Sequence, residues 1–383
     1  MSVEGYDPIA NPYAPGAGTP PPELVGRDAV VEAVEIALRR IVSSRSSQHQ
    51  LITGLRGVGK TVLLGKLAAL AEHVGFRVIR VEAVGGEDTL VSFLRQSRRI
   101  VEDLDRSKAA LRALRSIESV SLSVAGTGFS LDRAGTAPDR EAVTDVVVDT
   151  AAAAAAEDRG VMIAIDEAQM VDPHDLRRVL AGAHRCGQDG LPLFVTLAGL
   201  PNLVGIVAKA ATYSERMFRV SDLGPLSADQ VTQAIVAPAS ELGVVWSAPA
   251  LEAVVDHSDG YPFFVQTWAY HTWNAAVDDP ISAEDVVRAT PQVDQALDNA
   301  FFAARLARTP ASEVAYVRAL ASLGPGPHRS GEVAEADGKT TSQVAAFRDR
   351  LIAEGLIYAP RYGWVEFAIP HFDRFVSRNM PAD

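Results

Sequence analysis

Eight residues between Gly54 and Thr61 have types and spacing suited to binding phosphate. They read GLRGVGKT, which matches the pattern G-x-x-x-x-G-K-[ST] in full. The glycines let the backbone curl so that peptide N–H groups point inward, and a helix starting at Lys60 adds the positive end of its dipole. We expect Lys60 to reach the β- and γ-phosphates of a nucleotide and Thr61 to bind Mg²⁺. The predicted nucleotide-binding residues of this loop are Gly54, Leu55, Arg56, Gly57, Val58, Gly59, Lys60, Thr61 and Val62.

A second group with chemical potential is the acidic pair Asp166–Glu167. It directly follows the apolar run 161–165, which is typical of a buried strand in a parallel sheet. Such a strand would deliver Asp166 to the edge of the sheet at which phosphates bind. Asp166 is therefore predicted to hold Mg²⁺, largely through water, and Glu167 to orient and polarise an attacking water. A solvated acidic strand end is the alternative explanation.

The segments around these motifs predict an α/β fold with a parallel sheet. Strands alternate with helices in the first 225 residues, as a parallel sheet requires. The predicted strands are 49–53, 76–82, 161–165, 193–198 and 218–223. The predicted helices are 23–40, 61–73, 90–115 and 140–157, and the alternating stretch 119–131 predicts a small hairpin.

The pattern changes at Ser227, after which only helices are predicted for about 80 residues. Ser227, Ser247 and Ser282 each precede a helical segment, which is typical of helix N-caps. From about Thr309 the order is helix, helix-turn-helix and two short strands, which predicts a winged helix. The predicted domains are thus an extended N-terminal arm (1–22), a nucleotide-binding domain (23–225), an all-α lid (226–305) and a winged-helix domain (306–383).

The composition excludes several classes of protein. The chain is 48% hydrophobic and 22% charged, which is ordinary for a globular protein. No apolar run is long enough for a membrane span, and the first residues lack the features of a secretory signal. The single cysteine, Cys186, excludes an intramolecular disulfide. These features favour a cytoplasmic protein with no membrane partner.

Together, the motifs resemble those of AAA+ ATPases of the signal-transducing (STAND) and origin-recognition-like branch. The resemblance covers residues 23 to about 376. It implies a parallel P-loop sheet, a helical lid and a C-terminal winged helix. Residues 23–28 (ELVGRD) resemble the entry motif that borders the adenine. This implies that Val25 and Gly26 lie against the base with Arg27 nearby, and an ordinary helix start at Asp28 is the alternative.

Two further segments resemble parts of the AAA+ machinery. Residues 193–201 resemble the sensor 1 strand, which implies that Thr196 or a neighbouring backbone group contacts the γ-phosphate. The asparagine found there in many AAA+ proteins is absent, and a plain buried strand is the alternative. Residues 213–219 resemble the segment that carries the arginine finger, which would make Arg216 catalytic towards a neighbouring copy. A surface arginine pair is the alternative.

The lid offers one more motif. Gly260-Tyr-Pro262 resembles the lid motif whose proline, Pro262, packs near the nucleotide. Phe263 stands where a sensor 2 arginine is commonly expected, which favours a switch over a fast motor.

The winged helix raises the question of DNA. Residues 329–378 contain seven basic and seven acidic side chains, whereas phosphate binding favours a basic face. Arg348, Arg350 and Arg361 could still form a local cluster, and the basic segment 95–115 is a second candidate surface. The alternatives are a winged helix that contacts protein or restrains the ATPase, and a solvated helix face.

The sequence therefore predicts a protein that binds ATP and ADP with Mg²⁺ and hydrolyses ATP slowly. We expect an AAA+/STAND-like switch that couples nucleotide state to domain arrangement. A DNA-associated ATPase, initiator-like or regulatory, is the alternative. A homo-oligomer, a protein partner and duplex DNA bound through the winged helix all remain open.

Overall fold

The computed structural model describes residues 6–16, 19, 21, 24–83, 88–104, 107–126, 142–303 and 309–380. The chain forms two compact units. One comprises residues 27–54 and 60–222 and is called the sheet unit below. The other comprises residues 1–26, 55–59 and 223–383 and is called the helical unit.

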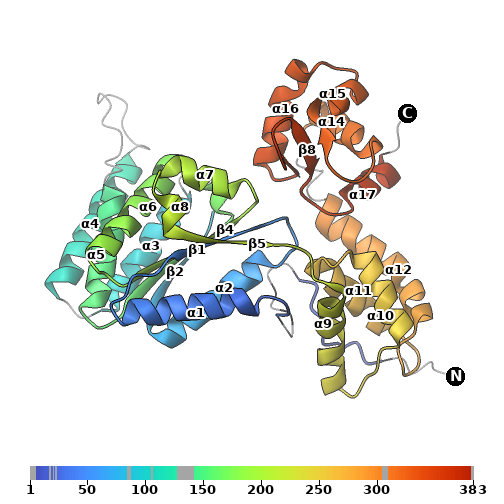
Figure 1. Ribbon diagram of the computed structural model, residues 1–383, viewed down its shortest axis with the longest axis horizontal. Coiled ribbons are helices and arrows are strands. Elements are labelled where there is room, and N and C mark those ends of the chain that lie inside the picture. Colours follow the sequence, from blue (N-terminus) through green and yellow to red (C-terminus); the bar gives the residue numbers. More distant parts are fainter. Residues whose placement is uncertain are drawn as a thin grey trace. The chain divides into compact units, whose positions relative to one another are not determined.

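The centre of the sheet unit is a five-stranded sheet (Figure 1). Its strands are β1 (His49–Gly54), β2 (Phe76–Glu82), β3 (Gly160–Asp166), β4 (Leu193–Gly199) and β5 (Phe218–Leu223). The order across the sheet is β2-β3-β4-β1-β5, and β2, β3, β4 and β1 run parallel. Strands β1, β3 and β4 are buried along their whole length. The predicted α/β fold with a parallel sheet is confirmed.

Helices cover both faces of this sheet (Figure 1). They are α1 (Asp28–Val42), α2 (Lys60–Val74), α3 (Asp88–Glu102), α4 (Lys108–Gly126), α5 (Ala142–Ala155), α6 (Pro173–Gln188), α7 (Leu203–Ala210) and the short α8 (Ser214–Met217). Helices α1 and α2 lie on one face; α3, α5, α6 and α7 lie on the other, with α4 packed outside on α3 and α5. The sheet is thereby a buried middle layer, as its continuous apolar strands require.

Three predictions about the elements of this region were wrong. The alternating stretch that predicted a hairpin from residue 119 is helical as far as Gly126, and residues 127–131 lie outside the described part of the chain. Ala113, Ile117 and Val120 are buried at the spacing of one helix face, so the helical period overrides the local alternation. The single helix predicted at 90–115 is two helices, α3 and α4. The helix predicted from residue 23 begins only at Asp28.

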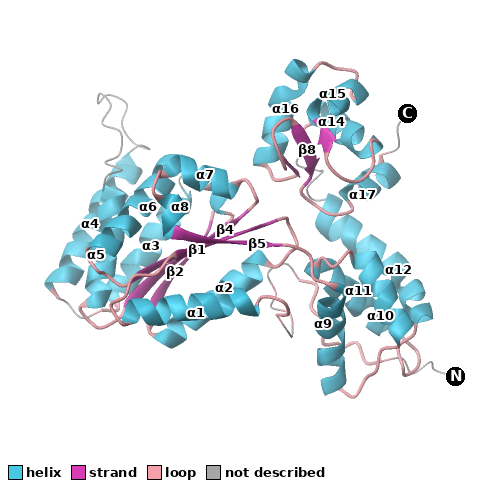
Figure 2. Cartoon of the chain, viewed as in Figure 1, coloured by secondary structure: helices cyan, strands magenta, loops and turns pink. Residues whose placement is uncertain are grey.

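The helical unit contains a bundle and a small mixed module (Figure 2). The bundle consists of α9 (Ala228–Glu241), α10 (Ala248–Ser258), α11 (Pro262–Ala275) and α12 (Ala283–Leu297), followed by a π-helical turn, η2 (Asp298–Ala303). Ser227, Ser247 and Ser282 each accept a hydrogen bond from a backbone N–H of the first turn, so the predicted N-caps are confirmed. Among the described residues, no helix is both long and apolar enough to cross a membrane.

The C-terminal module combines helices with a three-stranded sheet of order β6-β8-β7. Its elements are α14 (Ala311–Ser322), β6 (His328–Arg329), α15 (Ser330–Ala336), α16 (Thr341–Ala353), β7 (Ile357–Tyr358), β8 (Trp364–Phe367) and α17 (Phe372–Asn379). Both strand pairings are antiparallel. The sequence predicted α14, α15, α16, β7 and β8 in this order, and it missed β6 and α17.

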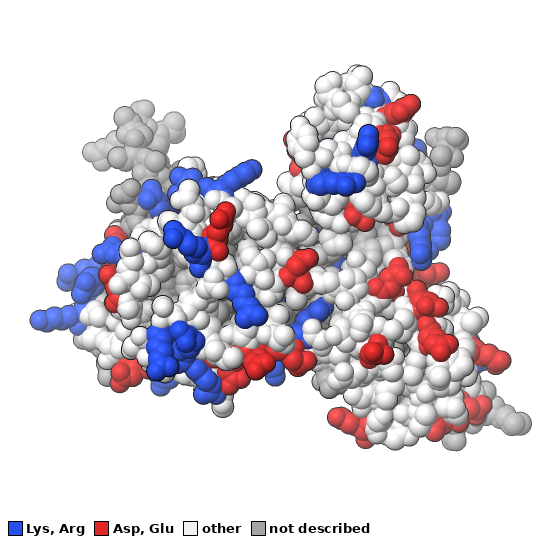
Figure 3. Space-filling view, viewed as in Figure 1, with Lys and Arg blue, Asp and Glu red and all other residues white. Residues whose placement is uncertain are grey.

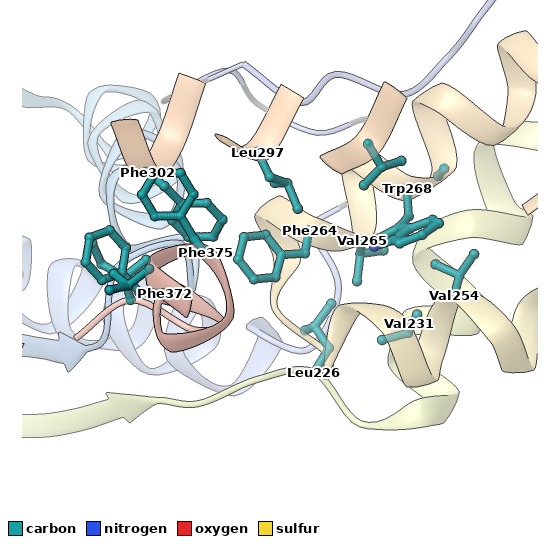
Figure 4. Close-up of a cluster of buried hydrophobic side chains, with 14 of the residues drawn as sticks. Leu226, Val231, Val254, Phe264, Val265, Trp268, Leu297, Phe302, Phe372 and Phe375 are labelled. Carbon is teal, nitrogen blue, oxygen red and sulfur yellow. The ribbon is translucent and has the colours of Figure 1, made fainter. Parts of the chain in front are cut away.

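The bundle and the C-terminal module share one hydrophobic core (Figure 4). Phe302 of η2 lies between them: its ring is 6.4 Å from Phe264 of α11 and 5.1 Å from Phe375 of α17. His371 hydrogen-bonds to Asp259 at 2.6 Å and packs edge-on against Phe264. Burial of aromatic rings is among the largest contributions to packing, so these contacts join the two parts firmly.

The described part of the N-terminal arm packs on the bundle. Tyr13 is 3% exposed, and its hydroxyl donates to the carbonyl of Ile235 at 2.8 Å. Asn11 donates to the carbonyl of Tyr270, and the Trp273 indole donates to the carbonyl of Asp7. The described residues of the arm form no helix or strand, and side-chain hydrogen bonds rather than a backbone ladder hold them in place.

Candidate functional site

The glycine-rich loop leaves β1 at Gly54 and enters α2 at Lys60, as its sequence predicted. Gly57 and Gly59 have φ angles of 85° and 91°, values that glycine adopts without the steric penalty of a side chain. A Cβ added at Gly59 would meet no heavy atom within 4 Å, so open space lies beside the loop there. This is the backbone shape and the free space that a phosphate group needs.

The lysine of the motif is turned inward. Lys60 is 6% exposed, and its ammonium donates to the carbonyl of Gly54 at 2.9 Å. The next side chain, Thr61, is exposed, and Val62 is partly buried. A buried ammonium held by a neutral carbonyl is a ready partner for an anion, because a hydrogen bond between two charged groups is the stronger one.

Asp166 and Glu167 lie at the carboxyl end of β3. The register pairs Ile165 with Leu197 of β4, and β4 lies between β3 and β1. Asp166 is therefore two strands, or about 10 Å, from the end of β1 at which Gly54 lies. Its side chain is 7% exposed and accepts a hydrogen bond from the backbone N–H of Glu167 at 2.9 Å. Glu167 itself has a left-handed backbone, with φ of 49°.

These residues fit Mg²⁺ bound with a nucleotide. The available groups are one hydroxyl and carboxylates, and Mg²⁺ prefers oxygen ligands. In the part of the chain that the structure describes, no group of three His, Cys, Asp or Glu side chains could hold a metal by itself. Mg²⁺ commonly takes one or two carboxylates, several waters and substrate phosphates.

The tip of the phosphate loop contacts two helix ends within the helical unit. The Arg56 backbone N–H donates to the carbonyl of Ala368 at 3.3 Å. Its guanidinium donates to the carbonyls of Gly355 at 3.2 Å and Glu354 at 3.4 Å, at the end of α16. The carbonyl of Gly57 accepts from the N–H of Phe263 in the first turn of α11, also at 3.3 Å. The ends of a helix have backbone N–H and C=O groups that lack partners within the helix itself, and the loop provides hydrogen-bond partners for some of these groups.

The residues that the sequence assigned to the adenine are divided between the two units. Val25 is 8% exposed and Gly26 has φ of 72°; a Cβ at Gly26 would be 2.6 Å from the Gln230 amide nitrogen. Pro262 is the first residue of α11. These three belong to the helical unit, whereas Arg27, at the N-cap of α1, belongs to the sheet unit. Burial of Arg27 lowers the pKa of its guanidinium.

Arg216 lies far from the phosphate loop within the sheet unit. It is an exposed residue of α8, and its carbonyl accepts from Gln48, just before β1 begins. Thr53, near the other end of β1, instead donates to Asp222 at the end of β5. Arg216 and Lys60 are thus at opposite ends of β1, a separation of about 20 Å at 3.3 Å per residue.

Thr196, expected as a sensor, is in the interior of β4. It pairs with Ala164 on one side and Gln50 on the other. It is 0% exposed, and its hydroxyl has no hydrogen-bond partner among the described residues.

The sequence missed Gln169, which lies two residues after Glu167 in the short 3₁₀ helix η1 (Ala168–Met170). Its amide nitrogen donates to the Glu167 carboxylate. The only sequence signal was a polar amide two residues after an acidic pair, between Ala168 and Met170.

Two family models match parts of the chain. Residues 23–196 match the family model described as the AAA ATPase domain. Residues 299–376 match a domain of unknown function (DUF8462). No curated protein matches the chain.

Several solved structures are similar to the chain. A Walker-type ATPase of Pyrococcus abyssi has a TM-score of 0.54 and 17% identity, covering 94% of this chain and 97% of that one. The Aeropyrum pernix Orc1 protein, solved in complex with DNA, has a TM-score of 0.47 and 17% identity, covering 94% of this chain and 94% of that one. A Thermotoga maritima RuvB mutant has a TM-score of 0.48 and 13% identity, covering 89% of this chain and 92% of that one. The first of these supports the fold alone.

Replacing Lys60 tests the phosphate-binding assignment. We expect Lys60→Ala to weaken binding of a fluorescent ATP analogue with Mg²⁺ at least about tenfold, because a hydrogen bond to a charged group contributes about 1.5–3 kcal/mol. Lys66→Ala is the matched control, since Lys66 is an exposed lysine of the same helix. Equal affinity of the two variants would refute the assignment.

Proposed function

We propose that the protein binds ATP with Mg²⁺ at the carboxyl ends of β1 and β3 and hydrolyses it slowly. The observation that carries this proposal is the buried Lys60 ammonium beside an open glycine loop, with Asp166 two strands away. Lys60 would leave Gly54 to bind phosphate, and Thr61 and Asp166 would hold the metal. Bound Mg²⁺ would neutralise charge on the phosphates. Glu167 would orient a water and accept its proton.

We further propose that nucleotide state controls the helical unit, as in STAND-like switches. The support is the double attachment of the loop tip: Arg56 caps the end of α16 and Gly57 caps the start of α11. Because α11 and the C-terminal module share the core around Phe302, a change at the loop tip would act on both. The Arg56 N–H cannot bind phosphate while it donates to Ala368. Binding and attachment therefore compete.

The domain limits proposed with this function are residues 23–225 for the ATPase domain, 226–305 for the lid and 306–383 for a winged helix. The order of helices and short strands in the C-terminal module supports the last of these.

Charges around this module favour a protein contact over duplex DNA. Arg350 pairs with Glu313 at 2.6 Å, Arg348 pairs with Asp349, and the Arg361 guanidinium lies 3.8 Å from the Trp364 ring centroid. These arginines already have partners within the module. The segment 226–305 carries eleven acidic and two basic side chains, and acidic groups gather over the bundle (Figure 3). Such a surface repels phosphate.

Arg216 is proposed to act on the site of a neighbouring copy. Its exposure and its distance from Lys60 exclude contact with phosphate bound at Lys60 of the same chain. A guanidinium from a neighbour would stabilise transition-state charge. This proposal requires a homo-oligomer.

Changing the end of α16 tests the switch without altering the phosphate loop. Glu354→Arg places a cation at the exposed C-cap of α16, where it satisfies the helix end and repels Arg56. If Arg56 restrains the loop, the apparent affinity for an ATP analogue should rise about fivefold to tenfold, because a larger fraction of the protein becomes competent to bind.

The matched control is Glu335→Arg, the same change at an exposed residue of α15. Ala353→Arg, in the last turn of α16, makes the same prediction if Glu354→Arg fails to fold. Affinities equal to that of the control in both variants would contradict the coupling.

Mixing two inactive variants tests action between copies. We expect Arg216→Ala and Lys60→Ala each to lose phosphate release. A mixture should regain part of it, because a Lys60→Ala copy supplies Arg216 to a neighbour that retains Lys60. Light scattering would report assembly in the same samples. The proposal would be contradicted if the mixture assembles but does not regain phosphate release. It would also be contradicted if a proven monomer is fully active.

A further inference from the structure

Thr196, which the sequence offered as a sensor candidate, does not reach the carboxyl end of β4. Thr196 lies in the strand interior and is completely buried, which leaves it remote from the carboxyl edge of the sheet. At that edge the chain reads Ala198, Gly199 and Leu200, none of which has a polar side chain. A polar side chain that lies at this edge of the sheet beside β4 must therefore come from another element.

Gln169 supplies that group. Its amide oxygen accepts the backbone N–H of Leu200 at 3.2 Å, and its amide nitrogen donates to the Glu167 carboxylate. One side chain thus connects the end of β4 to the carboxylate assigned to the attacking water. Leu200 is 0% exposed and follows the last residue of β4, so its N–H needs a partner of this kind.

The chemistry of the two neighbours fixes the orientation of the amide. A carboxylate only accepts hydrogen bonds and a backbone N–H only donates them. Glutamine carries a donor and an acceptor at its tip. Glutamate would present two acceptors and no donor. Methionine, which has a similar length, would present neither a strong donor nor a strong acceptor. The connection is therefore specific to an amide.

Gly199 makes room for this connection. A Cβ at Gly199 would lie 2.2 Å from the Gln169 amide oxygen, closer than any real contact. Gly199 has no positive φ angle, so the backbone would tolerate alanine, but the Gln169 amide and the Leu203 side chain, 2.9 Å from such a Cβ, would both have to move. Gly199 also pairs with Thr53 of β1, the residue before Gly54. The amide therefore lies against the end of β4, and β4 pairs with the strand that leads into the phosphate loop.

We propose that Gln169 is a positioning residue that orients the Glu167 carboxylate and links it to the end of β4. This inference rests on the proposed ATP hydrolysis. Movement at the ends of β1 and β4 would reach Glu167 through Leu200 and the Gln169 amide.

Three variants separate the two halves of the connection. Gln169→Met removes both hydrogen bonds. Gln169→Glu keeps an acceptor for the Leu200 N–H but sets a carboxylate against Glu167. Gly199→Ala displaces the amide without changing it. Gln188→Glu is the matched control, an exposed glutamine at the end of α6.

We expect all three variants to lower kcat for phosphate release about tenfold to a hundredfold, within the range that a positioned general base contributes. Their affinity for an ATP analogue should stay within twofold of the unmodified chain, because none binds phosphate. The Gly199→Ala and Gln169→Met effects should not add, since both remove one interaction. Gln188→Glu should match the unmodified chain.

Amide hydrogen exchange gives a readout that does not depend on turnover. Exchange at Leu200 should accelerate in Gln169→Met and stay slow in Gln169→Glu. Unchanged kcat in Gln169→Met would overturn the inference, as would equally fast exchange in Met and Glu variants. If the unmodified chain and Lys60→Ala bind the ATP analogue equally, the proposed function fails as well; normal binding with unchanged kcat in Gln169→Met overturns the inference alone.

Discussion

The parallel pairing of β3, β4 and β1 is the constraint on which the site depends. Parallel strands bring their carboxyl ends to one edge, and here each of those ends leads into a residue with a different chemical capacity. Gly54 opens the phosphate loop, Asp166 ends β3, and Gly199 leaves space beside β4. None of these residues is close to the others in sequence. Burial of the three strands fixes their register, and the register fixes the spacing of the groups.

The elements around this edge were largely readable from the sequence. Continuous apolar runs predicted β3 and β4 because strands buried on both faces need them, and serines before periodic segments predicted the starts of α9, α10 and α12. The stretch from residue 119 misled because serine alternates with apolar residues there over a short window. The longer helical spacing of Ala113, Ile117 and Val120 decides the structure.

The contacts that position the groups of the site could not be predicted from the sequence. Arg56 is one of the variable positions of its motif, and its acceptors are backbone carbonyls about 300 residues later. Backbone acceptors carry no sequence signature, so only the fold reveals them. Gln169 is similar: its partner on β4 is the N–H of Leu200, and the enabling feature is the missing side chain of Gly199. Motifs report the groups that touch phosphate, while the groups that position them depend on tertiary structure.

Two physical features shape the proposed cycle. Lys60 is held by the carbonyl of Gly54, and the loop tip is held by two helix ends of the helical unit. Lys60 and Arg56 donate these bonds to neutral carbonyls, and an anionic phosphate is a stronger acceptor than a carbonyl. Binding energy from the nucleotide would then be converted into release of the end of α16, which suits a switch. The common core around Phe302 ensures that the bundle and the C-terminal module respond together.

Phosphate release from Mg-ATP by the full chain, compared with its Glu167→Gln variant, tests the central claim most directly. Glutamine keeps the shape of the side chain but cannot accept the proton of the attacking water. The account predicts slow release by the unmodified chain, a loss of about a hundredfold in the variant, and equal affinity of both for an ATP analogue. Equal rates of release from the two proteins would contradict it.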